Sequence, residues 1–145
     1  MKAIINPDGN RIYWSKGDLH TSYGMIKESE LKNGIIETHL GKKLIVFDAE
    51  FVDKLEKIKR GPAIMNKKDI GAILAYTGIN EKSKIVDAGT GCGVLAAYLG
   101  RISKHVVSYE KNKGFFKIAK ENLKLLDVNV KLKNKDIYEG ISEKN

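Results

Sequence analysis

KIVDAGTGCGVL, residues 84–95, is the stretch of sequence that decides how the second half of this chain folds. Its first five residues are mostly apolar and β-branched, which is typical of a strand inside a parallel sheet. From Leu95 to Ile102, apolar residues recur at helical spacing. The stretch therefore predicts a buried strand over 84–88, a glycine turn, and a helix over 93–102.

The turn between this strand and helix carries glycine at every second position, at Gly89, Gly91 and Gly93. Because glycine has no side chain, we expect a ligand to lie against bare backbone N–H groups at a positive helix end. The spacing disfavours a dinucleotide site, whose third glycine would stand where this chain has Val94. A phosphate loop would need Gly-Lys-Ser or Gly-Lys-Thr, which this turn does not contain.

Two acidic residues accompany the turn. Asp87 stands two residues before Gly89, where a carboxylate repels phosphate and attracts an ammonium group. Glu110 ends a second predicted strand, 105–110, and follows Gly89 by 110 − 89 = 21 residues. This is about the offset at which such a topology places an acid on ribose hydroxyls. A nucleoside that carries a cationic amino acid would fit both carboxylates.

These residues resemble motif I of class I S-adenosylmethionine-dependent methyltransferases. More narrowly, five segments resemble in order the archaeal tRNA (adenine-N1)-methyltransferases, which act on T-loop adenosines 57 and 58: residues 59–62, 68–71, 89–93, 107–110 and 135–141. The resemblance covers nearly the whole chain and stops halfway through the family's methyltransferase domain.

The resemblance implies a cofactor, S-adenosylmethionine, and a role for each matching residue. Asp87 and the turn backbone would hold the methionine part, Glu110 the ribose, and Asp136 with Ile137 the adenine. The implied cofactor-binding residues are Asp87, Gly89, Thr90, Gly91, Cys92, Gly93, Val94, Leu95, Glu110, Asp136 and Ile137. We interpret Cys92 as a small residue that fits a glycine turn, since no histidine base is assigned near it.

The N-terminal residues 1–48 predict a small all-β domain. Strands over 2–5 and 11–14 flank a Pro-Asp-Gly turn, and strands over 35–40 and 43–47 flank Gly41 and Lys42. His39 then falls in a strand, on its surface. In the resembled family such a domain helps to bind tRNA and supports a tetramer, so the resemblance implies an oligomer.

Residues 49–68 predict a connector, with an amphipathic helix over 49–59. Its basic residues Lys59, Arg60, Lys67 and Lys68 are candidates for contact with the tRNA backbone. The alternative is a solvated connector face. Residues 69–145 predict a partial Rossmann-like domain: after a helix over 69–77, strands over 84–88, 105–110 and 128–133 alternate with helices over 93–102 and 113–126.

Composition limits the other functions. The chain has 26 basic and 18 acidic residues, a net charge of +8, which favours a polyanion such as RNA or else a lysine-rich, heat-adapted surface. A single cysteine argues against a disulfide framework and a cysteine-rich zinc site, so we expect no metal and a cytoplasmic protein. The longest apolar runs are shorter than 18 residues, which predicts no membrane span.

In the resembled family, the acid that holds the target adenine belongs to an Asp-Leu-Pro motif on a fourth strand, and this sequence has no matching segment. We therefore assign no catalytic residue to this chain and expect it to be inactive alone. Either a second polypeptide completes the sheet, or the sequence is truncated. Two rival functions remain open: a non-catalytic tRNA-binding or assembly subunit of a methyltransferase complex, and a fragment of a nicotinamide-dependent oxidoreductase.

Overall fold

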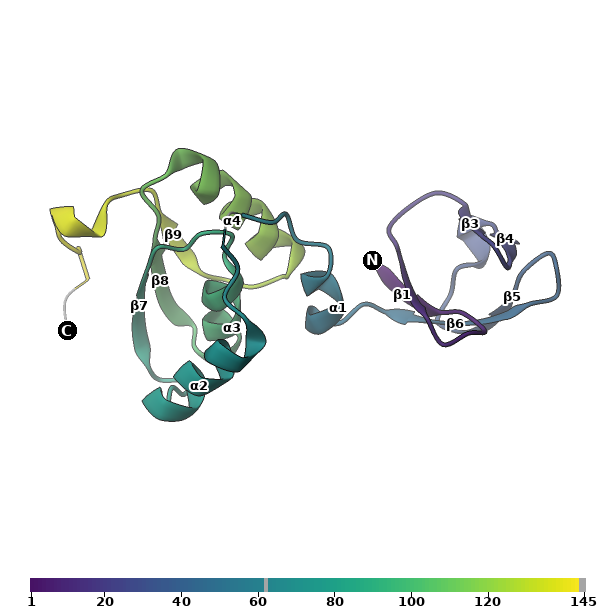
Figure 1. The fold of residues 1–145 in the computed structure, drawn as a ribbon, viewed down its shortest axis with the longest axis horizontal. Coiled ribbons are helices and arrows are strands. Elements are labelled where there is room, and N and C mark those ends of the chain that lie inside the picture. The colour runs from purple at the N-terminus through teal and green to yellow at the C-terminus, as the bar shows by residue number, and fades with distance from the viewer. Residues whose placement is uncertain (62, 144–145) are drawn as a thin grey trace. The chain divides into compact units, whose positions relative to one another are not determined.

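The computed structural model describes residues 1–61 and 63–143, and these form two compact units, Met1–Glu56 and a second unit that begins at Lys57 (Figure 1). The boundary falls inside the segment 49–68 that we predicted as a connector. Pro62, which belongs to the first resembling segment, lies outside the described residues.

The first unit is built on a four-stranded antiparallel sheet in the order β2-β1-β6-β5. Its strands are β1 (Lys2–Ile5), β2 (Arg11–Trp14), β5 (Gly34–Glu37) and β6 (Lys43–Asp48). Both predicted hairpins are present. The sequence did not predict a third hairpin, of β3 (Leu19–Thr21) and β4 (Gly24–Ile26), which forms a separate two-stranded sheet, because strands of three residues leave too little alternation to detect. A short 3-10 turn, Glu28–Glu30, follows β4.

The core of this unit is one cluster of aliphatic side chains from both sheets, together with Leu31, which follows the 3-10 turn. Its members are Ile4, Leu19, Ile26, Leu31, Leu44 and Val46. His39 was wrongly placed in a strand, because β5 ends at Glu37 and His39 lies in the turn that follows. Its Nδ1 accepts a hydrogen bond from the Met25 N–H at 2.8 Å, so it ties β4 to that turn.

The helix predicted over 49–59 is also shorter than expected, since α1 covers Phe51–Leu55. Its start is fixed by Asp53, whose carboxylate accepts the Glu50 N–H at 3.0 Å and pairs with Arg11 at 2.5 Å. The helix ends with the Glu56 N–H donating to the carbonyls of Asp53 and Lys54. Lys59 lies outside it, and both its N–H and its C=O bond to the side chain of Asn122.

The second unit has a three-stranded parallel sheet in the order β7-β8-β9, formed by Lys84–Ala88, His105–Tyr109 and Lys131–Lys133. Its helices are α2 (Lys67–Thr77), α3 (Val94–Ile102) and α4 (Lys113–Leu125), and a 3-10 turn covers Ile137–Glu139. The predicted alternation of strands and helices is therefore confirmed. Figure 1 shows α3 and α4 on the same side of the sheet.

Two element boundaries in this unit differ from the prediction. The helix expected from residue 69 begins at Lys67, because the Asn66 side chain caps it by accepting the Asp69 N–H at 2.8 Å. The last strand begins at Lys131 rather than at residue 128. Val128 donates its N–H back to the Leu123 C=O at 3.1 Å, so the chain there still closes the end of α4.

Close packing between α3 and the segment before β9 yields a prediction about Gly100. A Cβ at Gly100 would lie 2.6 Å from methyl groups of both Val128 and Val130, whereas nothing lies within 4 Å of a Cβ at Gly71 in α2. We expect Gly100→Ala to lower the free energy of unfolding by about 1–3 kcal/mol through overpacking. Gly71→Ala, which makes the same change in helix propensity, should raise it by up to about 1 kcal/mol. Urea unfolding of both variants tests this, and stabilisation by both would contradict it.

Candidate functional site

The glycine turn joins the carboxyl end of β7 to the start of α3 and has the conformation that its glycines permit. Gly89, Gly91 and Gly93 have φ values of 81°, 59° and 87°, all in the left-handed region that other residues avoid. A Cβ at Gly89 would meet nothing within 4 Å, so this part of the turn presents bare backbone. A Cβ at Gly93 would lie 3.4 Å from the Ala119 Cβ, so this glycine lets α3 approach α4.

Most of the turn's N–H groups are bonded within the protein. The N–H groups of Gly89 and Thr90 donate to the Tyr109 C=O at 2.9 and 3.1 Å, and that of Gly93 donates to the Thr90 C=O at 2.9 Å. The Gly91 N–H donates to the carboxylate of Glu110 at 2.9 Å. This differs from the open row of donors expected from the sequence. What the turn offers a ligand is a side-chain-free surface with acidic residues beside it.

Glu110 is aimed at the turn. It follows β8, is only 6% exposed, and accepts the Gly91 N–H through Oε2 and the Asn112 N–H through Oε1, both at 2.9 Å. A carboxylate has about four acceptor positions, so two remain for hydroxyl groups. Asn112 in turn caps α4, since its side chain accepts the N–H groups of Gly114 and Phe115. The first turn of α4 therefore helps to hold Glu110 in place.

Asp87 belongs to the same site through a chain of hydroxyl groups. The Ser108 Oγ donates to Asp87 at 2.6 Å and lies 2.5 Å from the Thr90 Oγ1, which connects the end of β7 to the turn. Burial raises the pKa of Asp87, the hydrogen bonds from Ser108 and the Ala88 N–H oppose this, and the charge of Glu110 adds to it. Ser108 was not predicted as a site residue, although its position opposite Asp87 in the parallel register follows once the strands are paired.

Two hollows adjoin the turn and share Ala88 and Gly89. The first, of about 370 Å³, contains seven of the predicted residues beside Phe115 and residues 63–65; those seven are Asp87, Gly89, Thr90, Gly91, Cys92, Val94 and Leu95. The second, of about 290 Å³, contains Gly89, Glu110, Asp136 and Ile137. Ten of the eleven predicted cofactor residues therefore line these two hollows, and the eleventh, Gly93, lines neither of them.

Asp136 also has a structural role. Its Oδ1 accepts the Tyr138 N–H at 3.1 Å and so caps the 3-10 turn over Ile137–Glu139, while its Oδ2 lies 3.5 Å from the Lys111 ammonium. Its carboxylate is partly exposed in the second hollow. The side chain can therefore serve the local turn and face a ligand at once.

Asn122 on α4 connects the turn to the segment before α2, and no motif or spacing in the sequence marks it as a site residue. It is 2% exposed; its Oδ1 accepts the Lys59 N–H, and its Nδ2 donates to the carbonyls of Lys59 and Cys92, all at 2.8 Å. The Cys92 thiol is buried and lies 3.9 Å from the Ala63 carbonyl. These contacts hold the backbone at Lys59 to the glycine turn. Residues 63–65, a few positions further along the chain, line the first hollow beside that turn.

The four basic candidates for tRNA contact, Lys59, Arg60, Lys67 and Lys68, are all exposed. The Lys59 ammonium already pairs with Glu121 at 2.5 Å, so its charge is partly used within the unit. Residues 1–61 and 63–143 contain no group of three or more histidine, cysteine or acidic side chains placed to bind a metal ion. Across the same residues, every helix is too short or too polar to cross a membrane.

A family model described as ribosomal RNA adenine dimethylase matches residues 63–142. The chain is 31% identical over 129 residues to the tRNA (adenine(57)-N(1)/adenine(58)-N(1))-methyltransferase TrmI of Methanocaldococcus jannaschii, a match over 84% of this chain and 45% of that protein. It is 36% identical over 76 residues to the ribosomal RNA small subunit methyltransferase A of Caldanaerobacter subterraneus subsp. tengcongensis, over 52% of this chain and 28% of that protein.

Solved structures show the same fold. A SAM-dependent O-methyltransferase from Thermotoga maritima matches 99% of this chain and 58% of its own, with a TM-score of 0.83 and 28% identity. The tRNA (m1A58) methyltransferase TrmI from Aquifex aeolicus matches 97% of this chain and 58% of its own, with a TM-score of 0.80 and 22% identity, and so supports the fold alone. The predicted resemblance and the class I methyltransferase fold are thereby confirmed. The chain spans less than half the length of these two curated relatives, 45% of the first and 28% of the second.

Proposed function

The chain belongs to the ribosomal RNA adenine dimethylase family, and from this we propose that it is the cofactor-binding part of an RNA adenine methyltransferase. S-adenosylmethionine is the expected cofactor, because the relatives are methyltransferases and one similar structure is named as dependent on it. The observation that carries the proposal is the pair of acids, Asp87 and Glu110, beside a glycine turn that two hollows adjoin.

Each part of the cofactor has a chemically suitable partner in this proposal. The Asp87 carboxylate binds the ammonium of the methionine part, and the two free acceptor positions of Glu110 take the ribose hydroxyls. Asp136 accepts from the adenine amino group while Ile137 contacts its ring. When bound, the cofactor supplies an electrophilic methyl group on a sulfonium. The residues of this chain bind and orient it, and placement of the reactants contributes much of the rate.

As the substrate, we propose N1 of T-loop adenosines 57 and 58 in tRNA. The match to the M. jannaschii tRNA methyltransferase supports this choice, because it extends over 84% of the chain, whereas the ribosomal RNA methyltransferase match covers 52%. The net charge of +8 suits a polyanion, and the exposed basic residues 59, 60, 67 and 68 are candidates for backbone contact. The target base would flip out of its loop to reach the methyl group.

A tRNA substrate and a single free cysteine suit a reducing cytoplasm.

We further propose that a second polypeptide completes the methyltransferase domain and supplies the acid that holds the target adenine. Within the described residues β7 pairs with β8 and with no other strand, so one edge of the parallel sheet is unpaired. On this proposal the chain alone binds cofactor but transfers no methyl group, and the complete enzyme assembles as an oligomer.

Isothermal titration of the chain with S-adenosylmethionine tests the central proposal, with NAD as the matched control ligand. We expect one equivalent of S-adenosylmethionine to bind and NAD not to bind. The titration is repeated after addition of the part of the M. jannaschii relative that this chain does not match. Absence of cofactor binding in both states would overturn the proposal and favour a non-catalytic tRNA-binding or assembly subunit.

Radioactive methyl transfer to an unmodified tRNA transcript tests the need for a partner. We expect transfer only when this chain is mixed with the added part of the M. jannaschii relative.

A further inference from the structure

Four lysines form a stripe along the exposed side of α4. Lys113, Lys117, Lys120 and Lys124 follow one another at intervals of four, three and four positions, a spacing that places them on one side of a helix. All four are exposed, whereas the other side of α4 is buried and contacts β9. This lysine stripe is about 16 Å long, because an α-helix rises about 1.5 Å per residue.

The charges of the lysine stripe are not neutralised within the described part of the chain. None of its four ammonium groups takes part in an ion pair there. The one acidic residue of α4, Glu121, lies next to the stripe but pairs with Lys59, at 2.5 Å. Side chains three or four residues apart on a helix begin about 5–6 Å from each other, which is less than the Debye length of about 8 Å at physiological ionic strength. The positive potentials of the four lysines therefore add.

The lysine stripe works against the helix that carries it. Lys113 lies in the first turn of α4, which has no acidic residue, and a positive charge there opposes the helix dipole. Lysines three and four residues apart also repel one another. A heat-adapted surface is built from ion pairs, with acidic residues among the lysines, so heat adaptation does not account for this helix. Departures from local preference are expected at functional sites, and a bound polyanion would offset both unfavourable effects.

A third hollow, of about 350 Å³, lies beside the lysine stripe. Lys120 and Lys124 border it, and its walls include Phe116 and aliphatic side chains of α4 and of residues 128–132. Phe115, the residue before Phe116, lines the first hollow beside the glycine turn, so neighbouring residues of α4 line the two hollows. Proteins bind single-stranded RNA with aromatic side chains next to basic ones, because a base stacks on the ring while the adjacent phosphates contact the cations.

We propose that the lysine stripe and the third hollow form an RNA-binding surface. The lysines contact the phosphates of an unpaired segment and release its counterions, and the hollow takes one unstacked base against Phe116. The choice of RNA as the polyanion rests on the proposed function. The ion pair with Glu121 holds Lys59, a candidate tRNA contact, beside α4. A membrane-binding helix would expose an apolar face beside its lysines, whereas every aliphatic and aromatic side chain of α4 is more than half-buried.

Fluorescence anisotropy with an unmodified tRNA transcript, over a range of salt concentrations, tests the lysine stripe in the full chain. The triple variant Lys117→Gln, Lys120→Gln, Lys124→Gln should bind at least about ten-fold more weakly, and its slope of log affinity against log salt should be smaller by about two to three. It should melt no lower than the wild type, because like-charge repulsion within α4 is removed. An unchanged affinity or slope would overturn the proposal, as would a wild-type chain that does not bind the transcript.

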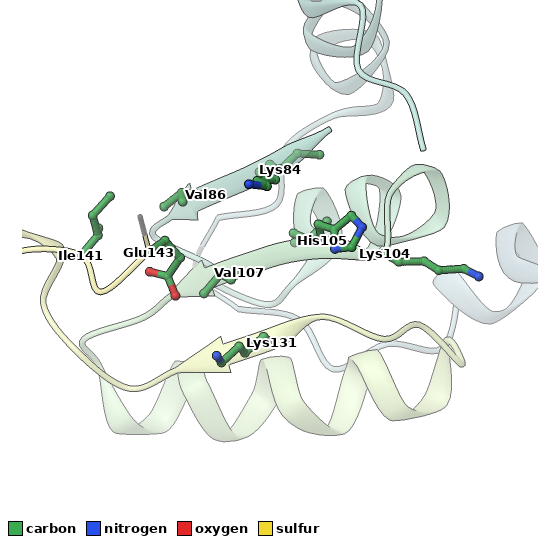
Figure 2. Close-up of a pocket in the computed structure, with 10 residues that line it drawn as sticks. Lys84, Val86, Lys104, His105, Val107, Lys131, Ile141 and Glu143 are labelled. Carbon is green, nitrogen blue, oxygen red and sulfur yellow. The ribbon is translucent and has the colours of Figure 1, made fainter. Parts of the chain in front are cut away.

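The matched control removes the same charge elsewhere in the second unit. Lys82→Gln, Lys84→Gln, Lys104→Gln changes three exposed lysines at the amino ends of β7 and β8, where Figure 2 shows Lys84 and Lys104. Affinity of this control for the transcript should stay within about three-fold of the wild type, because charges far from a contact are screened. Equal losses in the two triple variants would show attraction to the net charge alone and overturn the proposal.

Phe116→Leu tests the third hollow separately, since leucine keeps an apolar side chain there but removes the ring. An unstructured RNA of about 12 nucleotides should bind this variant about 5- to 50-fold more weakly, whereas a duplex RNA of the same length should bind within about three-fold of the wild type. Phe116→Tyr, which keeps the ring, should bind the single strand as the wild type does. Wild-type affinity in Phe116→Leu, or equal losses for the two RNAs, would overturn the placement of a base in this hollow.

Three further measurements separate this surface from other ligands and from the proposed function. Polyglutamate that displaces the transcript as effectively as unlabelled transcript would assign the lysine stripe to an acidic protein. Sedimentation with phosphatidylserine vesicles that the α4 triple variant loses would assign it to a membrane, and either result overturns the proposal. In titrations with S-adenosylmethionine, retained cofactor binding by the α4 triple variant, together with its weakened RNA binding, supports the surface. Absence of cofactor binding in a wild-type chain that still binds the transcript overturns only the proposed function.

Discussion

Asp87→Asn is expected to weaken S-adenosylmethionine binding about 30- to 150-fold and, at neutral pH, to make the second unit more stable. A hydrogen bond to a charged group contributes about 2–3 kcal/mol, which corresponds to this loss of affinity. The amide can still accept from the Ser108 hydroxyl at the position of the carboxylate oxygen, so the fold should not be disturbed. Titration calorimetry and thermal unfolding measure the two effects.

The pH dependence gives this prediction a second readout. Burial raises the pKa of Asp87 above its ordinary value, so the folded chain binds a proton there more readily than the unfolded chain. Unfolding therefore releases this proton, and the unfavourable contribution of the buried carboxylate to stability shrinks as the pH falls through the raised pKa. Cofactor affinity should fall over the same range, because the neutral acid no longer attracts an ammonium. Asp87→Asn should abolish both changes.

Glu81→Gln is the matched control, because it also converts a carboxylate to an amide but at an exposed position just before β7. Its stability and cofactor affinity should equal those of the wild type. Wild-type affinity in Asp87→Asn, or a lower melting temperature than wild type, would mean that Asp87 is a structural residue rather than a cofactor ligand.

Asn122→Ala is expected to have the second large effect. The change leaves three backbone groups without their partner: the Lys59 N–H and C=O and the Cys92 C=O. The Cys92 carbonyl is buried and the two Lys59 groups are partly buried. Each unsatisfied buried group costs about 1–3 kcal/mol and water recovers part of this at Lys59, so we expect a loss of about 3–5 kcal/mol of unfolding free energy. Residues 59–65 should lose protection from hydrogen exchange before the rest of the unit. Cofactor affinity should fall because residues 63–65 line the first hollow.

Two comparisons separate this positioning role from a general loss of stability. Asn129→Ala removes an exposed amide from the loop between α4 and β9 and should leave stability and affinity nearly unchanged. In Asn122→Asp, one carboxylate oxygen would face the Lys59 and Cys92 carbonyls. Its stability and the protection of 59–65 should therefore recover as the pH falls and the acid becomes a donor. Uniform destabilisation, without preferential exchange in 59–65, would contradict the assigned role.

The sequence predicted the second unit well where the deciding interactions are local. The alternation of strands and helices follows from short apolar runs and helical spacing, and the glycine spacing predicted the turn between β7 and α3. It predicted less well where a partner distant in the chain intervenes. The helix predicted over 49–59 was too long, and the periodicity within that segment carries no information about the bond of Lys59 to Asn122 on α4.

The candidate site divides in the same way. The glycine turn, Asp87 and Glu110 were determined by the sequence itself, because glycine conformation and the ends of parallel strands are properties of short segments. Tertiary structure alone decided that Glu110 bonds to the Gly91 N–H, that Ser108 joins Asp87 to Thr90, and that Asn122 fastens residue 59 to the turn. Those contacts join residues 18 to 63 positions apart. Such a separation is bridged only after the strands have paired and the helices have packed, and a linear pattern does not record which side chains then meet.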